Sequence, residues 1–225
     1  MTEKHNTKRI TMMRQFIDTA FQMAQEESFE SLTVRNLASK TNYNSSTIYY
    51  YFSNFDNLLT FVALKYLSEF FKELWYIEQN YVNSIDLFVK TFKILIKYVI
   101  KYPQQFQILL LGNDQIILEE VLKIYYQIYP DGHIREHASF PMIKRGNITS
   151  IPTLELCISH GHIKAKSRDK ILELMESIFH TLIRKSLVTT DVEELLDIEN
   201  RYNEYVRLFV QCYKTPLGIL HTPDI

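Results

Sequence analysis

The sequence predicts an all-α protein, in which an N-terminal three-helix unit with a helix-turn-helix precedes a larger C-terminal helical region. Apolar residues recur at intervals of three and four along most of the 225 residues, which is the spacing of one helix face. Strand signals are nearly absent, because few runs alternate and no Asn-Gly or Asp-Gly hairpin joins such runs. No glycine occurs before Gly112, so the helices of the first half are not interrupted.

The first predicted helix covers residues 8–26. Its apolar residues fall on one face at helical spacing, and its charged and amide residues lie mostly on the other. The apolar set is Ile10, Met13, Ile17, Ala20, Phe21 and Ala24.

Two short helices joined by a tight turn follow. Thr33 is suited to cap a second helix that ends near Lys40, because its hydroxyl can accept from a backbone N–H of the first turn. The turn is residues 41–43, where Asn42 tolerates positive φ better than its neighbours. A third helix begins near Asn44, which completes a helix-turn-helix outline.

The third helix has four consecutive aromatic residues, which cannot all face one core. Ile48, Tyr51 and Phe52 share a face and are expected to pack inward. The outward face is then Ser45, Ser46, Tyr49 and Tyr50. Serine and phenol hydroxyls can bond phosphate oxygens and base edges, so this face suits a DNA groove. The alternative is that Tyr49 or Tyr50 packs on the next helix or on a neighbouring chain.

The remaining chain is expected to consist of longer helices. A fourth helix should begin after Ser53 or Asn54, with Asp56 completing a capping box, and should run to about residue 77. Later helices are expected at 84–102, 103–112, 114–130 and 149–160, with an irregular connection at 131–148. The basic stretch 164–170 is expected to be a solvated helix start capped by Ser167, with a second anion site as the less favoured alternative. Thr190 and Glu193 should cap the last helix.

Residues 29–59, FESLTVRNLASKTNYNSSTIYYYFSNFDNLL, resemble the N-terminal DNA-binding domain of the TetR-type (TetR/AcrR) transcriptional regulators. The resemblance is carried by Phe29, Thr33-Val34, Leu37-Ala38, the stretch from Thr47 to Phe52, and Leu58-Leu59. It implies a DNA-binding domain at residues 1–54 and a ligand-binding and dimerisation domain at residues 55–225. The implied function is a ligand-responsive repressor that binds a near-palindromic operator as a homodimer.

The resemblance also implies roles for single residues. Thr33 would lie against a phosphate, and Asn44, Ser45 and Ser46 would meet base edges. Tyr49 would bind the DNA backbone, and Tyr50 could contact backbone or base. Nearby basic residues would add phosphate contacts. The predicted DNA-binding set is Lys8, Thr33, Arg35, Asn44, Ser45, Ser46, Tyr49 and Tyr50.

Three residues depart from the family pattern. Asn42 replaces the usual turn glycine, Ser46 replaces the glycine of the reading helix, and Phe55 replaces a lysine that contacts phosphate. Up to Asn54 the chain has six basic and five acidic residues, a net charge of +1. Few phosphate contacts predict a shallow dependence of affinity on salt.

The C-terminal region is expected to hold the dimer interface and an effector pocket. Two apolar stripes on one helix need two partners, which the family meets with a four-helix bundle between subunits, although a large monomeric core would produce the same pattern. The predicted interface is Leu174, Ile178, Leu182, Tyr202, Tyr205, Val206 and Phe209. An apolar or aromatic effector would suit the candidate pocket residues Phe88, Phe92, Phe106, Tyr125 and Tyr126, each of which could also be plain core.

Composition restricts other functions. The formal net charge of −1 means that any DNA must be held by a local patch. Neither a secretory signal nor an apolar span of about 20 residues is found, so we expect a cytoplasmic protein that does not bind membranes. Cys157 and Cys212 are expected to be reduced and buried.

No metal site, cofactor or catalytic activity is predicted. The pairs His133/His137 and His160/His162 have spacings that can bind zinc, but no cysteine or second helical motif supports them. The sequence has no Gly-rich phosphate loop, nucleophile elbow or paired catalytic carboxylates. The expected partners are double-stranded DNA, a small effector and a second copy of the chain. The alternative function is a protein-interaction module that keeps the helix-turn-helix shape without binding DNA.

Overall fold

The computed structural model describes residues 3–111, 118–130, 142–144 and 147–216. Over these residues the chain is helical apart from one short hairpin, and the all-α expectation is confirmed. The α-helices are α1 Glu3–Glu26, α2 Val34–Thr41, α3 Ser45–Tyr51, α4 Phe55–Tyr66, α5 Ser68–Gln79, α6 Ser84–Lys101, α7 Pro103–Leu111, α8 Leu118–Ile128, α9 Pro152–Ser159, α10 Arg168–Val188 and α11 Val192–Tyr213.

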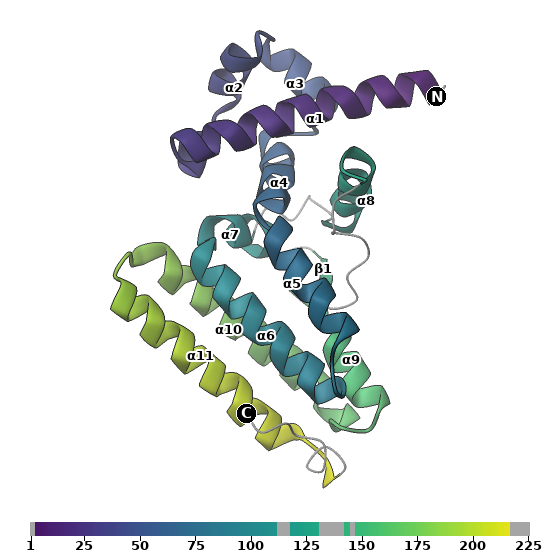
Figure 1. Cartoon of the computed structure of the whole chain (residues 1–225), viewed down its shortest axis with the longest axis vertical. Coiled ribbons are helices and arrows are strands. Elements are labelled where there is room, and N and C mark those ends of the chain that lie inside the picture. Colours follow the sequence, from purple (N-terminus) through teal and green to yellow (C-terminus); the bar gives the residue numbers. More distant parts are fainter. Residues whose placement is uncertain (1–2, 112–117, 131–141, 145–146, 217–225) are drawn as a thin grey trace.

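Helices α1, α2 and α3 form a small unit at one end of the molecule (Figure 1). The long α1 contacts both short helices, and a single-turn helix at Phe29–Ser31 leads from α1 toward α2. Apolar side chains from all three helices meet in the interior of this unit, where Phe16, Leu37 and Ile48 are completely buried. This burial confirms the inward face predicted for the third helix.

The predicted fourth helix is wrong in one respect, because it is two helices. α4 ends at Tyr66 and α5 begins at Ser68, with Leu67 between them at φ −90° and ψ 15°. No proline or glycine marks this break, which is why the sequence does not show it. Leu67 itself is completely buried.

Helix α6 is the centre of the larger region. It lies between α5 and α11 in Figure 1 and also contacts α7, α9 and α10. Most of its length is buried, which requires partners on several sides. Helix α4 contacts α1, and it also contacts α7 and α8. α4 therefore touches both the three-helix unit and the larger region.

A two-stranded hairpin corrects the expectation of an irregular connection at 131–148. β1 covers Met142–Lys144 and pairs antiparallel with β2, Asn147–Ser150. The helix expected from residue 149 instead begins at Pro152, because the preceding residues belong to β2. Residues 131–141 lie outside the described ranges.

Some helix caps agree with the sequence and others differ. Thr33 caps α2 as expected, and Asn44, near which the third helix was expected to begin, caps α3. α4 begins after Asn54, one of the two expected positions, and the Asn54 side chain accepts from the N–H of Asn57 at 2.7 Å. Asp191, not Thr190, caps α11, and Ser167 precedes α10 without a side-chain capping bond. Among the described residues, no helix has both the length and the apolar character to cross a bilayer.

Candidate nucleic-acid interface

The turn between α2 and α3 depends on one left-handed residue. Asn42 has φ 62° and ψ 29°, and its N–H bonds the carbonyl of Ser39 at 3.3 Å. The next N–H, of Tyr43, bonds the carbonyl of Ala38 at 3.0 Å. Asparagine tolerates this conformation better than most non-glycine residues, so the prediction for Asn42 is confirmed.

Side-chain caps define where α2 and α3 begin. The Thr33 hydroxyl accepts from the N–H of Asn36 at 3.1 Å. The Asn44 carboxamide oxygen accepts from the N–H of Thr47 at 2.8 Å and from the hydroxyl of Thr47 at 2.8 Å. Each cap satisfies a backbone donor that an isolated helix would leave unpaired, which is worth about 1 kcal/mol. Both short helices therefore start at fixed residues.

Phe16 of α1 anchors α3. Its ring centroid lies 5.4 Å from that of Tyr43, 5.8 Å from that of Tyr51 and 6.4 Å from that of Phe52. Edge-to-face aromatic pairs at such separations are favourable beyond simple burial. α3 is consequently held against α1 through its inward face, and its outward face is fixed in direction.

That outward face is exposed to solvent. Tyr49 and Tyr50 are 47% and 68% exposed, Ser46 is exposed and Ser45 is half-buried. The predicted orientation is thus confirmed, and neither tyrosine packs into the described core. An exposed aromatic pair beside small hydroxyl side chains can approach and bond another polar surface.

Several basic residues of the three-helix unit are accessible to solvent. Arg35 and Lys40 of α2 and Lys8 of α1 are exposed, and Arg9 is half-buried. Lys40 lies 3.7 Å from Glu26, in a pair whose side chains are both about half exposed, so this ion pair restrains it weakly.

Phe55 occupies the first position of α4, where a phosphate-binding lysine was expected from the family pattern. Its side chain is half-buried and packs against the core. The position therefore adds apolar contact inside the protein and no cation.

A polar junction that the sequence did not predict joins α1, α4 and α8. Asp18 of α1 accepts hydrogen bonds through one oxygen from the Lys65 ammonium group of α4 and from the Tyr129 hydroxyl group that follows α8. Arg14 lies 3.7 Å from the other oxygen, and its guanidinium carbon is 5.3 Å from the Tyr129 ring centroid. No sequence signal could have identified the cluster, because its members are 47 and 111 residues apart.

Burial has raised the pKa values of two tyrosines at this junction. For Tyr129 burial is the largest cause, followed by the hydrogen bond to Asp18 and the charge of Asp18. The pKa of Tyr125 is raised by burial and then by the charge of Asp18. Both phenols therefore remain neutral donors near neutral pH.

The seven residues predicted for a dimer interface differ in their exposure to solvent. Leu182, Tyr202, Val206 and Phe209 are buried within their own chain, and Ile178 is partly buried. Leu174 and Tyr205 are 40% and 42% exposed. Other exposed apolar side chains on α10 and α11, which the sequence reading did not include, are Val188, Val192, Leu196 and Leu208.

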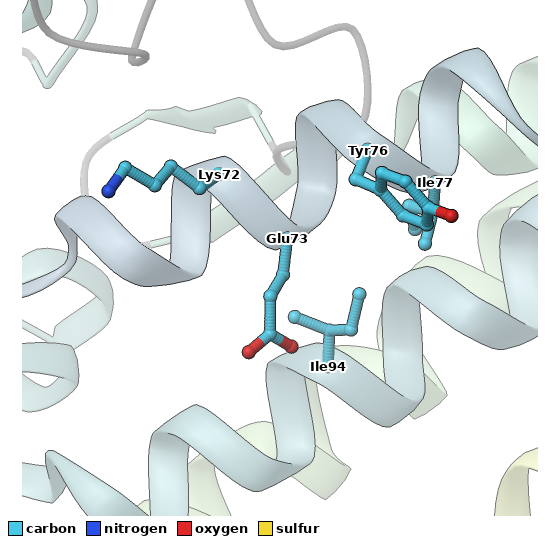
Figure 2. Close-up of a pocket in the computed structure, with 5 residues that line it drawn as sticks. All are labelled: Lys72, Glu73, Tyr76, Ile77 and Ile94. Carbon is cyan, nitrogen blue, oxygen red and sulfur yellow. The ribbon is translucent and has the colours of Figure 1, made fainter.

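The predicted effector residues lie within packed aromatic clusters. Phe88 stands 4.6 Å from Phe92 and 5.7 Å from Phe209 between ring centroids, and Phe106 stands 5.6 Å from Phe70. Tyr125 is buried and Tyr126 half-buried. An open hollow of about 250 Å³ lies instead between α5 and α6 (Figure 2). It is lined by Lys72, Glu73, Tyr76, Ile77 and Ile94, and Glu73 extends from α5 toward α6.

The histidine pairs give no described metal site. His133 and His137 lie outside the described residues. His160 is exposed, whereas His162 is buried, and its Nδ1 lies 2.6 Å from the Ser84 hydroxyl oxygen. Within the described part of the chain, no group of three or more histidine, cysteine, aspartate or glutamate side chains is placed to hold a metal ion.

In a comparison with known proteins, one family model matches the three-helix unit. Residues 16–60 match the family model described as bacterial regulatory proteins of the tetR family. The match includes α1 from Phe16 onward, all of α2 and α3, and the first half of α4. No curated protein and no solved structure matches the chain.

Proposed function

From the premise that the chain is a DNA-binding transcriptional regulator of the tetR family, we propose that it acts as a repressor. In this proposal a homodimer binds a near-palindromic operator and is released by a small apolar or aromatic effector. Such a regulator works where the DNA is, which places it in the cytoplasm.

The outward face of α3 is the observation that carries the proposal. Tyr49 and Tyr50 expose large polar-tipped rings that contribute little to their own core, beside the exposed Ser46. A helix inserted into the major groove presents such side chains to bases and phosphates. Thr33, Arg35 and Lys8 lie on the neighbouring helices of the same unit and are proposed to hold the backbone.

Dimerisation is proposed through the exposed apolar side chains of α10 and α11. Tyr205 and Leu208 are three residues apart on α11 and are 42% and 50% exposed, and Leu174 of α10 is 40% exposed. Surfaces of this kind often mark protein–protein contacts. A twofold dimer would carry two reading helices, which suits half-sites about 34–36 Å apart or a multiple of that.

The effector is proposed to act through α4. This helix contacts α1 of the reading unit and α7 and α8 of the larger region, so a shift of the larger region can be passed to α3. Binding among Phe88, Phe92, Phe106, Tyr125 and Tyr126 would have to separate packed rings. An effector stabilises the non-binding conformation only by its preference for that conformation, typically about 1–3 kcal/mol.

A band-shift titration with the full-length chain and genomic DNA fragments tests the proposal. We expect selective binding of a few fragments, with affinity that falls as salt rises. Protection of DNA beside the regulator's own gene would then locate an operator. Uniform binding to all fragments, or none at micromolar protein, would contradict the proposal.

The substitution Tyr49→Ala separates a DNA reader from a protein-interaction module. Tyr49 is exposed, so its loss should leave the fold unchanged. A reader loses affinity for the selected fragments, whereas a module without DNA function shows no DNA effect. The matched control is Tyr76→Ala on α5, since Tyr76 is also an exposed tyrosine but lies far from the reading helix in the fold.

A further inference from the structure

The reading surface of α3 carries no charged side chain. The helix is SSTIYYY, so it contains no arginine, lysine, glutamine, aspartate or glutamate. Arginine or lysine paired with O6 and N7 of guanine is the commonest base-specific contact in the major groove. α3 cannot make that contact, and specificity there must come from hydroxyl groups and aromatic rings.

Asn44 is also unable to read a base in the usual bidentate way. Pairing with adenine requires the carboxamide oxygen to accept from N6 while the amide nitrogen donates to N7. In the structure that oxygen already accepts two hydrogen bonds from Thr47, one from its N–H and one from its hydroxyl, both at 2.8 Å. Because these bonds occupy the two lone pairs, Asn44 serves as a cap.

Tyr50 presents an exposed aromatic surface. Its ring is 68% exposed, and its centroid lies 5.1 Å from that of Tyr51 with the ring planes at 88°. Tyr51 in turn rests on Phe16, so the Tyr50 ring is supported from behind. A fixed aromatic ring in the major groove can pack against the C5-methyl group of thymine, the only apolar group that a base presents there.

Ser46 extends this surface along the helix. It stands one turn before Tyr50 and is exposed. The two residues are about 6 Å apart along the helix axis, somewhat less than two base-pair steps. Where the helix follows the groove, base pairs up to two steps apart can therefore meet the serine and the tyrosine together.

The cations of the reading unit lie elsewhere. Arg14 is engaged by Asp18 and Tyr129, and Lys40 lies 3.7 Å from Glu26. Arg35 is exposed, but on α2. These positions suit phosphates at the groove border, so charge contributes affinity without sequence discrimination.

Resting on the proposed function, we propose that α3 reads thymine C5-methyl groups through Tyr50. The chain therefore selects half-sites that are A·T-rich at the base pairs facing Ser46 and Tyr50, without bidentate recognition of guanine by α3.

Base analogues test this reading directly. The full-length chain selects binders from a random-sequence duplex library, and the enriched pool is resynthesised with uracil for thymine, which removes only the methyl group. A second resynthesis uses 7-deazaguanine for guanine, which removes the N7 acceptor. We expect the uracil pool to bind more weakly, roughly fourfold for each methyl contacted, and the 7-deazaguanine pool to bind as the natural pool does.

The outcomes separate this inference from the proposed function. Enrichment of a pool whose binding is unaffected by uracil, or is weakened at least as much by 7-deazaguanine, overturns the inference and leaves DNA recognition intact. Failure to enrich any sequence overturns both.

Variants of Tyr50 give a second readout, the ratio of affinities for the thymine and uracil pools. Tyr50→Ala should bring this ratio close to one, whereas Tyr50→Phe, which keeps the ring, should preserve it. Tyr76→Ala is the matched control, since Tyr76 is an exposed tyrosine on α5. A thymine preference that persists in Tyr50→Ala contradicts the proposal.

Discussion

The hydroxyl group of Tyr129 donates a hydrogen bond of 2.5 Å to the carboxylate of Asp18, across 111 residues of sequence. The same oxygen of Asp18 accepts from Lys65, so one carboxylate joins the three-helix unit to α4 and to the end of α8. The Lys65 ammonium group also lies 5.2 Å from the Tyr129 ring centroid. If α8 moves relative to α1, the hydrogen bonds to Asp18 must therefore break, or the bonded groups must move together.

Asp18→Asn and Tyr129→Phe should show coupled effects on stability. Each removes one side of a charge-assisted hydrogen bond, normally worth about 1.5–3 kcal/mol. Because the Asp18 side chain is 41% exposed, we expect a coupling near 1 kcal/mol in a double-mutant cycle measured by urea unfolding. Asp197→Asn, which removes the charge of an exposed i, i+4 ion pair with Arg201, is the control and should change stability little. Additive effects of the two substitutions would show that the contact contributes nothing.

The raised pKa of Tyr129 should also change how stability depends on pH in the alkaline range. Burial and the bond to Asp18 raise the pKa of this phenol above its unfolded value of about 10. The folded state then binds more protons than the unfolded state above pH 10, so its stability declines as the pH rises further. Urea unfolding at pH 9, 10 and 11 should show a smaller decline in Tyr129→Phe than in the unmodified chain. Equal declines would mean that this phenol does not contribute.

The stability of α3 should depend on a hydrogen-bond acceptor at its cap residue, Asn44. Asn44→Ala removes the oxygen that accepts from Thr47 and should cost about 1 kcal/mol of stability, with faster amide exchange at the start of α3. Asn44→Asp and Asn44→Ser keep an acceptor and should restore most of that loss. Exchange rates that are the same in Asn44→Ala and the unmodified chain would contradict this role.

Association of the chain should depend on the exposed apolar residues of α11. Leu208 is 50% exposed, so Leu208→Glu places a charge on the surface without opening the core. We expect sedimentation equilibrium to show a dimer for the unmodified chain and a monomer, or a dimer weakened at least about tenfold, for the variant. Val82→Glu, at a residue 82% exposed beyond the end of α5, should leave the dimer intact. A dimer unaffected by Leu208→Glu would place the interface elsewhere.

The two cysteines should differ in reactivity. Cys157 is completely buried, and burial raises the pKa of its thiol to about 12, although a side-chain hydrogen bond with Ser84 opposes the shift. Cys212 is exposed. A disulfide reagent at pH 8 should therefore modify Cys212 rapidly and Cys157 only on unfolding, because the thiolate is the reactive species. Cys212→Ala should abolish the rapid phase; a rapid phase that remains would contradict the burial of Cys157.

The sequence alone was sufficient to predict those features that depend on interactions between residues close together in the chain. The cap at Thr33, the left-handed Asn42 and the spacing of Ile48 and Phe52 each act within one or two helical turns, so the reading unit and the outward direction of Tyr49 and Tyr50 were predictable. The DNA-binding role of these residues stays a prediction. The expectation that both cysteines are buried was wrong for Cys212, because helical periodicity gives a face but not its partner.

Tertiary structure decided what depends on contacts between distant segments. The break at Leu67 has no proline or glycine to mark it, and it falls at a completely buried leucine. Tyr202, Val206 and Phe209 could have faced a partner subunit or their own core, and the position of α6 beside α11 assigned them to the core. Asp18, Lys65 and Tyr129 meet only when α1, α4 and α8 are assembled. Residues so far apart in the chain are joined by the packing of whole helices, which no local pattern encodes.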